Sequence, residues 1–270
     1  MKAKIGTDIT EAQRLLEAGE VVAIPTETVY GLAGNGFNLK AISEIFAVKN
    51  RPKFDPLILH TDSLEKLKAW VDEFPPLAQQ LAEVFWPGPL TLVLPKTNQI
   101  PELVTSGLPD VAFRIPAHSL TRELLSRLDF PLAAPSANPF GFVSPTTPTH
   151  VHTQLGDKIP YILDGGACPV GLESTIIAFP DGKPKILRLG GLALEEIEKV
   201  IGKVEVQNHS SSNPAAPGML KSHYSPRQPL ILGDLNELLD HYKGQNVGVL
   251  SFRERDFPEN VSISLTLSPS

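Results

Sequence analysis

The stretch of residues 49–60 constrains the fold more than any other part of the sequence, because it joins a helix to a buried strand across two prolines. Apolar residues recur at roughly helical spacing over residues 39–48, which predicts an amphipathic helix. Pro52 should stop this helix, since its ring disfavours a helical conformation at the preceding residue. The apolar run 56–59 then predicts a short buried strand with His60 at its carboxyl end.

The same stretch concentrates positive charge in a chain whose formal net charge is -6. Lys49, Arg51 and Lys53 all fall around the predicted bend. A planar guanidinium and an ammonium at one bend suit a multiply charged anion, above all a phosphate chain. The alternative is a solvated basic helix end, which the helix dipole also favours. Taken alone, the stretch favours this alternative.

The bulk composition narrows the class of protein. A chain of 270 residues can form one large domain or two smaller ones. With 41% hydrophobic and 20% charged residues, it has the composition of an ordinary globular protein. The acidic balance argues against a general electrostatic affinity for nucleic acid. No apolar run approaches the ~20 residues that span a bilayer. The single cysteine, Cys168, excludes an internal disulfide. We therefore expect a cytoplasmic protein without a membrane partner.

Two predicted strands end in polar loops. The strand at residues 21–24 runs into Thr26, Glu27 and Thr28, which place hydroxyls and a carboxylate in a loop. Ligands of open α/β sheets bind outside the carboxyl ends of the strands. The strand at 132–134 leads to Ser136 and Asn138, whose small side chains beside backbone N–H groups suit a phosphate. Both loops could equally be ordinary turns with local hydroxyl bonds.

Other candidates are weighed individually. Arg114 lies in the predicted strand 111–116 among apolar neighbours, so it is either an edge residue facing water or a carboxylate clamp in a cavity. We favour the clamp. His150 and His152 point to different sides of a helix, which argues against a metal site. Cys168 has no basic neighbour in sequence and is expected to be an inert apolar side chain.

The carboxyl-terminal part changes in composition. Strands at 173–179 and 185–189 should pair through a turn at Asp181, and a helix should follow at 194–201. Residues 203–228 are rich in serine and proline, which indicates a linker, and its Tyr224 could close over a site as part of a lid. Beyond it, runs at 230–232, 235–242 and 247–252 predict strand, helix and strand. We expect this to be the start of a small, incomplete parallel α/β unit.

Taken in order, these motifs resemble the L-threonylcarbamoyladenylate synthases, a YrdC-like family, in the long form with a linker and a carboxyl-terminal domain. Leu220 and Ser222 depart from the basic residues often found in that linker. The matching stretches are 25–32, 49–60, 86–94, 111–116, 135–138, 144–146, 163–175, 186–188 and 217–226. The resemblance implies a twisted mixed α/β sheet around a large open cavity (residues 1–202), a linker (203–228) and a small Rossmann-like α/β domain (229–270).

The resemblance also implies a reaction: L-threonine, bicarbonate and ATP give threonylcarbamoyl-AMP and pyrophosphate, for threonylcarbamoyladenosine in tRNA. Magnesium is expected with the ATP, without a confident protein ligand, and tRNA and the downstream transfer machinery are possible partners. The implied catalytic, phosphate-binding residues are Lys49, Arg51, Ser136 and Asn138. The residues implied along the nucleotide are Asp55, Asp110, Ser144, Arg188 and Tyr224. Those implied for threonine are Thr28, His60, Arg114, Ala134 and Ser174.

Two other functions compete with this interpretation. The related carbamoyltransferase of hydrogenase maturation carries cysteine-rich zinc fingers, and a single cysteine argues against it. A non-enzymatic module that binds double-stranded RNA or tRNA could use the basic residues around Arg51. Such binding depends on phosphate contacts and falls steeply with salt. The acidic net charge makes it the weaker alternative.

Overall fold

The computed structural model describes residues 2–207, 228–253 and 256–267. The chain divides into two compact units, Met1–Ser225 and Pro226–Ser270, which we describe separately. Tyr224 and most of the predicted linker lie outside the described residues. No helix in the described parts of the chain is long and apolar enough to cross a membrane.

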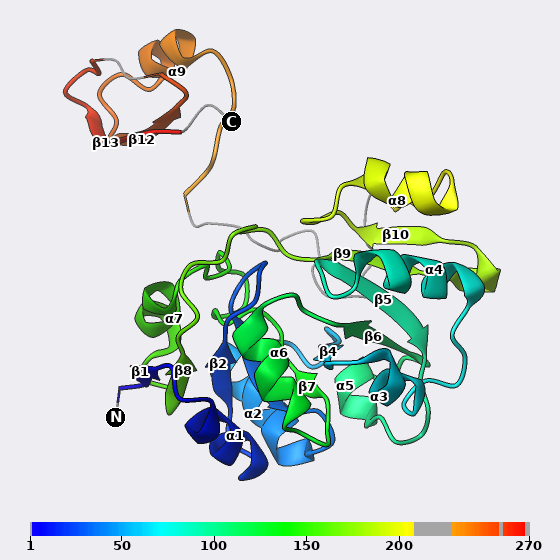
Figure 1. Cartoon of the computed structure of the whole chain (residues 1–270). Coiled ribbons are helices and arrows are strands. Elements are labelled where there is room, and N and C mark those ends of the chain that lie inside the picture. The colour runs from blue at the N-terminus through cyan, green and yellow to red at the C-terminus, as the bar shows by residue number, and fades with distance from the viewer. Residues whose placement is uncertain (1, 208–227, 254–255, 268–270) are drawn as a thin grey trace. The chain divides into compact units, whose positions relative to one another are not determined.

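The first unit is built on one mixed sheet (Figure 1). In the order of the sheet, its strands run β1-β8-β2-β3-β7-β4-β6-β5-β9-β10-β11. Their bounds are β1 (Lys4–Gly6), β2 (Val22–Ile24), β3 (Gly31–Asn35), β4 (Ile58–His60), β5 (Leu90–Pro95), β6 (Asp110–Arg114), β7 (Leu132–Ala133), β8 (Tyr161–Leu163), β9 (Thr175–Ala178), β10 (Lys185–Arg188) and β11 (Glu205–Val206). The predicted hairpin is confirmed, because β9 and β10 pair antiparallel. β11 extends the sheet into residues that the sequence assigns to the linker.

Four helices of this unit, α1, α2, α3 and α7, begin at a residue whose side chain caps the first turn. The side chain of Asp8 accepts hydrogen bonds from the first turn of α1, and that of Asn38 does the same for α2. The helices are α1 (Ile9–Glu17), α2 (Leu39–Lys49), α3 (Leu64–Lys68), α4 (Pro76–Phe85), α5 (Glu102–Thr105), α6 (Ser119–Ser126), α7 (Pro148–Leu155) and α8 (Leu194–Ile201). Pro180–Gly182 forms a 3-10 turn between β9 and β10.

Helix α2 ends for a different reason from the one predicted from the sequence. The helix stops before the proline, at Asn50, which adopts a left-handed conformation with φ of 52°. The amide of Arg51 then donates to the carbonyl of Phe46 at 2.9 Å, and the amide of Asn50 to that of Ala47 at 3.1 Å. This pair of bonds satisfies carbonyls that the helix leaves free at its end. Pro52 therefore follows a helix that is already closed.

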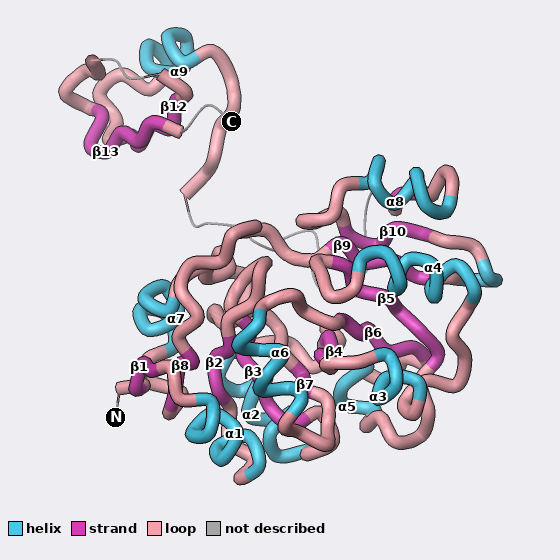
Figure 2. Tube along the Cα trace, in the orientation of Figure 1, coloured by secondary structure: helices cyan, strands magenta, loops and turns pink. Residues whose placement is uncertain are grey.

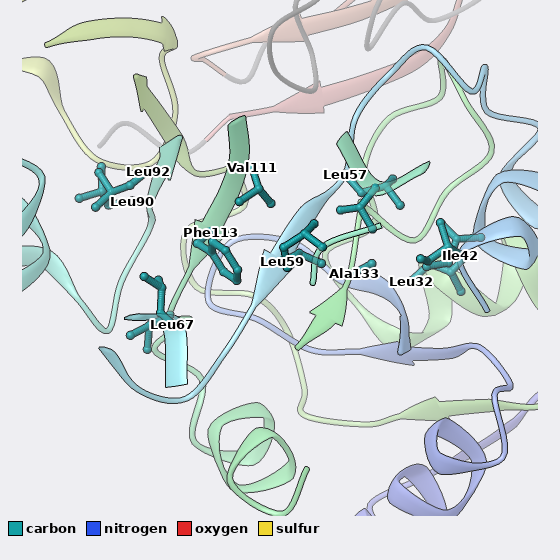
Figure 3. Packing of buried hydrophobic residues seen from close by; sticks show 14 of the residues in the cluster. Leu32, Ile42, Leu57, Leu59, Leu67, Leu90, Leu92, Val111, Phe113 and Ala133 are labelled. Atoms are coloured by element: carbon teal, nitrogen blue, oxygen red, sulfur yellow. The ribbon is translucent and has the colours of Figure 1, made fainter. Parts of the chain in front are cut away.

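The two faces of the sheet are covered unequally. On one face, α2, α3, α4, α5, α7 and α8 cover the sheet along nearly its whole width. Their core includes a row of side chains in register across neighbouring strands, seen for Leu59, Phe113 and Leu92 in Figure 3. Of the described helices, α1 and α6 pack on the other face, against β2, β3, β7 and β8. Among the described residues, half of this second face has no helix above it.

The uncovered half carries a small apolar cluster whose members all lie on strands. Its members are Ile58, Val93, Ala112, Ile176 and Leu187, from β4, β5, β6, β9 and β10. Side chains alternate between the faces of a strand, so His60 and Arg114 share the face of Ile58 and Ala112. These two residues are also direct partners in the parallel pairing of β4 with β6. The open half of the sheet therefore brings polar side chains together.

The second unit contains α9 (Leu235–His241), β12 (Val247–Ser251) and β13 (Val261–Thr266), with β12 and β13 parallel (Figure 2). The predicted helix and the strand after it are confirmed. The strand predicted at 230–232 is wrong. Leu230 and Leu232 are almost fully exposed there and pair with no strand of the described residues. An apolar run by itself does not make a strand, because a strand also needs a neighbour for its backbone groups.

Candidate functional site

A pocket opens on the half of the sheet that no described helix covers. Several of its walls come from strand ends: Thr28 follows β2, Arg114 ends β6 and Arg188 ends β10. The lining residues are Thr28, Val29, Arg51, Ile58, His60, Arg114, Ala134, Pro135, Ser136, Glu173, Ser174 and Arg188. Strands and loops distant in sequence thus meet at one site, as expected for a ligand pocket at the ends of sheet strands.

Arg114 is fixed at three points. Its Nε donates to the carbonyl of Gly88 at 3.2 Å and its Nη1 to Oγ1 of Thr28 at 2.8 Å. Its Nη2 lies 2.6 Å from Oε1 of Glu27, in a buried ion pair. Burial lowers the pKa of Arg114, and the charge of Glu27 opposes that shift. Arg114 is therefore buried at the pocket, which excludes the edge position facing water.

Arg51 is held by the loop that it starts. Its guanidinium forms an ion pair with Asp55 at 2.9 Å and donates to the carbonyl of Pro56 at 2.8 Å. The carboxylate of Asp55 is completely buried, and burial raises its pKa while Arg51 opposes that change. Asp55 does not line the pocket. Its place behind Arg51 makes it a support for that guanidinium.

Lys49 also lies behind the pocket wall. It is almost fully buried, and its Nζ donates to the carbonyls of Ser136 and of Asn138, the latter at 2.6 Å. Burial, with the charge of Arg51 added, lowers the pKa of Lys49 well below its usual range. Asn138 is buried too, and its Nδ2 donates to the carbonyls of Pro139 and Phe142. In this conformation Lys49 and Asn138 shape the loop, and Ser136 is the member that reaches the pocket.

The opposite wall carries a hydroxyl and carboxylate network. Arg188 donates through Nε and Nη2 to the carbonyl of Ser174, at 3.1 and 2.9 Å. Oγ of Ser174 lies 2.7 Å from Oγ1 of Thr91. Ser144 donates to Oε1 of Glu173, which is the one carboxylate among the described lining residues. A Cβ at Gly190 would lie 2.2 Å from the carbonyl oxygen of Glu173, so only glycine fits there.

His60 is a neutral group in the pocket. It is almost fully buried, and its Nδ1 has no hydrogen-bond partner among the residues that the structure describes. Burial, with a smaller effect from the charge of Arg114, lowers the pKa of His60 to about 3. The imidazole therefore stays uncharged near neutral pH. It can act as a hydrogen-bonding group beside the arginines without adding to their charge.

The structure brings together eight of the residues that the resemblance implies. These are Thr28, Arg51, His60, Arg114, Ala134, Ser136, Ser174 and Arg188. Lys49, Asp55, Asn138 and Ser144 lie behind that wall. Asp110 begins β6, at the far end from Arg114, and lines a second cavity with Val93 and Leu187. Tyr224 lies outside the described residues.

Of the residues that support the pocket, sequence reasoning pointed to Glu27 but not to Glu173 or Thr91. Glu173 lines it, Glu27 pairs with Arg114 and Thr91 contacts Ser174. Glu27 is the one with a signal in the sequence, since it lies between two threonines where a strand ends. Cys168 has a pKa raised to about 11, chiefly by burial, which fits the expected inert thiol. Among the described residues, no group of three or more His, Cys, Asp or Glu could hold a metal.

The arrangement suits negatively charged ligands. Three guanidiniums, those of Arg51, Arg114 and Arg188, meet at one pocket beside the hydroxyls of Thr28 and Ser136. Guanidinium groups bind carboxylates and phosphates with matched planar geometry. The fold and the pocket thus define an α/β protein with an arginine-lined pocket on the open face of its sheet.

Comparison with known proteins gives this class a family. Residues 14–190 match the Sua5/YciO/YrdC family profile, described as "Telomere recombination". Residues 192–269 match the profile described as "Threonylcarbamoyl-AMP synthase, C-terminal domain". The chain therefore belongs to the Sua5/YciO/YrdC family, on its threonylcarbamoyl-AMP synthase branch. It is accordingly an enzyme of the transferase class, and the predicted family and fold class are confirmed.

Two relatives and one solved structure illustrate the similarity. The chain is 42% identical to a threonylcarbamoyl-AMP synthase of Pyrococcus abyssi, over 92% of this chain and 77% of the relative. It is 41% identical to one of Bacillus subtilis, over 92% of this chain and 75% of the relative. A crystal structure of P. abyssi Sua5 complexed with L-threonine superposes with a TM-score of 0.92. That match has 41% identity and covers 97% of this chain and 80% of that one.

Proposed function

We propose that the protein condenses L-threonine, bicarbonate and ATP to threonylcarbamoyl-AMP and pyrophosphate, and that the product serves the modification of an adenosine in tRNA. The observation that supports this most directly is the convergence of Arg51, Arg114 and Arg188 on one pocket. The substrates bring a carboxylate, a bicarbonate and a triphosphate, so the pocket must balance several negative charges. A cytoplasmic location remains our prediction for this reaction.

In this proposal the pocket has two ends. Arg114, with Thr28 and the neutral His60, binds the threonine carboxylate and hydroxyl. Arg51, Arg188 and Ser136 bind the phosphates, with Lys49 and Asn138 holding the Ser136 loop in shape. The threonine amine and bicarbonate give a carbamate and water. A carbamate oxygen then attacks the α-phosphorus of ATP and pyrophosphate leaves. Such a transfer depends mainly on alignment and on charge stabilisation.

Magnesium is proposed as the partner of the triphosphate. The fit is reasonable, because magnesium is commonly held by one or two carboxylates together with phosphates and water. Glu173 is the carboxylate on the described pocket wall, and Ser144 fixes one of its oxygens. When bound, the ion would neutralise charge on the phosphates. The other described residues of the pocket would orient the two substrates.

Pyrophosphate release tests the proposal. We expect release from ATP to require both L-threonine and bicarbonate in the wild-type protein. In Arg51→Ala it should fall by at least about a hundredfold, because a guanidinium contact to the phosphates is lost. The same variant leaves Asp55 buried without its partner. A double variant, Arg51→Ala with Asp55→Ala, removes that leftover charge and should be equally inactive while folded. Release that ignores threonine would reject the proposed reaction.

A further inference from the structure

Glu27 is not among the residues that we propose to contact a substrate, yet its carboxylate makes specific contacts inside the protein. Its side chain is about nine-tenths buried and does not line the pocket. Its Oε1 lies 2.6 Å from Nη2 of Arg114, and its Oε2 accepts a hydrogen bond from the amide of Ala117 at 3.0 Å. Each carboxylate oxygen thus faces a donor, one on a side chain and one on the backbone just after β6.

The backbone around Glu27 is fixed as well. Its carbonyl accepts from the amide of Val170 at 2.9 Å, and the carbonyl of Thr28 accepts from Gly171 at 3.1 Å. Oγ1 of Thr26 accepts from the amides of Thr28 and Val29. The loop therefore presents Glu27 to Arg114 from a rigid base.

Glu27 is the charged member among the partners of Arg114. The other two, the carbonyl of Gly88 and the hydroxyl of Thr28, are neutral. A guanidinium recognises a carboxylate through two parallel N–H groups, so its orientation decides how well it binds. A buried guanidinium without a carboxylate partner is strongly unfavourable, so loss of the Glu27 charge is expected to change how Arg114 is oriented.

We propose that Glu27 is a positioning residue for threonine: it holds the guanidinium of Arg114 in the orientation that binds the amino-acid carboxylate. The inference rests on the proposed function, because it takes threonine as the ligand of Arg114. Glu27 itself touches no substrate. It acts from behind, through the Nη2 of Arg114, and the amide of Ala117 keeps it aligned.

Glu27→Gln tests this with little change of shape. Both neighbours of the carboxylate are donors, and a glutamine offers one acceptor and one donor, so it can satisfy only one of them. We expect the KM for threonine to rise about ten- to a hundredfold, the range produced by small misplacements of a binding group. The KM for ATP should stay within about twofold. Glu123→Gln is the matched control, because Glu123 pairs with Arg127 at the same 2.6 Å but is exposed.

A binding measurement separates positioning from general damage. Titration calorimetry with L-threonine and with L-threoninamide, which lacks the carboxylate charge, measures what the clamp contributes. The wild type should prefer threonine, and Glu27→Gln should lose most of that preference. Equal weakening of both ligands, or a parallel rise in the KM for ATP, would overturn the proposal. If the glutamine variant does not fold, Glu27→Asp keeps the charge and should still weaken threonine more than threoninamide.

Failure of the function and failure of the inference give different results. A wild-type protein that releases pyrophosphate without threonine, and does not bind it, contradicts the proposed reaction. A wild type that needs threonine, together with a Glu27→Gln variant of unchanged threonine affinity and preference, contradicts only the positioning role.

Discussion

At the scale of single residues, the charges behind the pocket matter as much as those that line it. Arg114 and Arg51 face the pocket, while their carboxylate partners Glu27 and Asp55 do not line it. Buried ion pairs contribute little net stability, yet breaking one leaves an uncompensated charge in the interior. Such pairs are thus better understood as devices that set geometry. A guanidinium fixed in this way needs no rearrangement when its ligand arrives.

His60 makes the stability of the protein depend on pH. Its pKa of about 3 in the folded state lies below the ordinary value near 6.5, because burial disfavours the charged ring. The unfolded chain therefore takes up a proton first, and stability is full above about pH 6.5 and falls as the pH drops toward 3. Urea unfolding should show a loss of about 2 kcal/mol between pH 6.5 and about pH 5 from this residue.

Replacement of the His60 imidazole tests whether this residue causes the predicted pH dependence. His60→Asn should remove this part of the pH dependence, whatever it does to stability at neutral pH. His150→Asn, which changes an exposed histidine at the start of α7, should keep the wild-type dependence. Identical pH dependence in His60→Asn and the wild type would show that the imidazole does not stay neutral when folded.

At the scale of elements, the end of α2 sets the position of Arg51, which follows its last residues. Asn50 holds the left-handed conformation there, which is unfavourable for most residues by about 1 to 2 kcal/mol, less for asparagine and absent for glycine. Asn50→Ala should lower the free energy of unfolding by about 1 kcal/mol. Asn50→Gly should leave it within about 0.5 kcal/mol of the wild type. Urea midpoints at unchanged slope measure both, and equal losses in the two variants would contradict this account.

Helices were the elements that the sequence predicted best. The helices α2, α8 and α9 lie where the sequence predicts them, at residues 39–48, 194–201 and 235–242, and Asn38 caps α2 as propensity expects. The stop of α2 was attributed to Pro52 and belongs to Asn50, because asparagine tolerates the left-handed region and acts earlier in the chain. Leu230 and Leu232 failed as a strand because pairing is a property of neighbours, which an apolar run does not specify.

The partners inside the site were harder to predict for a related reason. Arg114 and His60 stood out because a charged or polar group within an apolar strand is unusual. That Glu27 would meet Arg114, or that Thr91 would meet Ser174, depends on strands far apart in sequence lying side by side. Sequence spacing contains no measure of that distance. Lys49 illustrates the same limit, since nothing local shows that its ammonium group points into the protein.

At the scale of the whole molecule, the two units differ in how much they can stabilise themselves. The apolar clusters of the first unit all fall between Ala3 and Val206. In the second, Val249 is the only buried apolar side chain among residues 228–253 and 256–267. A segment this short with two paired strands is marginal by itself. A fragment of residues 1–207 should therefore unfold in one cooperative transition.

The matching fragment, residues 228–270, should show no cooperative transition. Circular dichroism with heating, on both fragments and the full chain, measures this directly. A cooperative transition in the short fragment would mean that few buried side chains suffice there. Loss of the transition in residues 1–207 would mean that the large sheet depends on the rest of the chain.

The strand order of the sheet has a consequence for synthesis. β2 pairs with β3 next to it in sequence but also with β8, and β8 is the one partner of β1 among the described strands. β5 likewise pairs with β9, which is made much later. A chain emerging from the ribosome can therefore complete neither pairing until β8 and β9 have been made. Distant pairings of this kind slow folding. While the second half of the first unit is translated, β1 must therefore stay unpaired, and β2 and β5 must each stay without one of their two neighbours. This makes the interval the one in which a chaperone would bind.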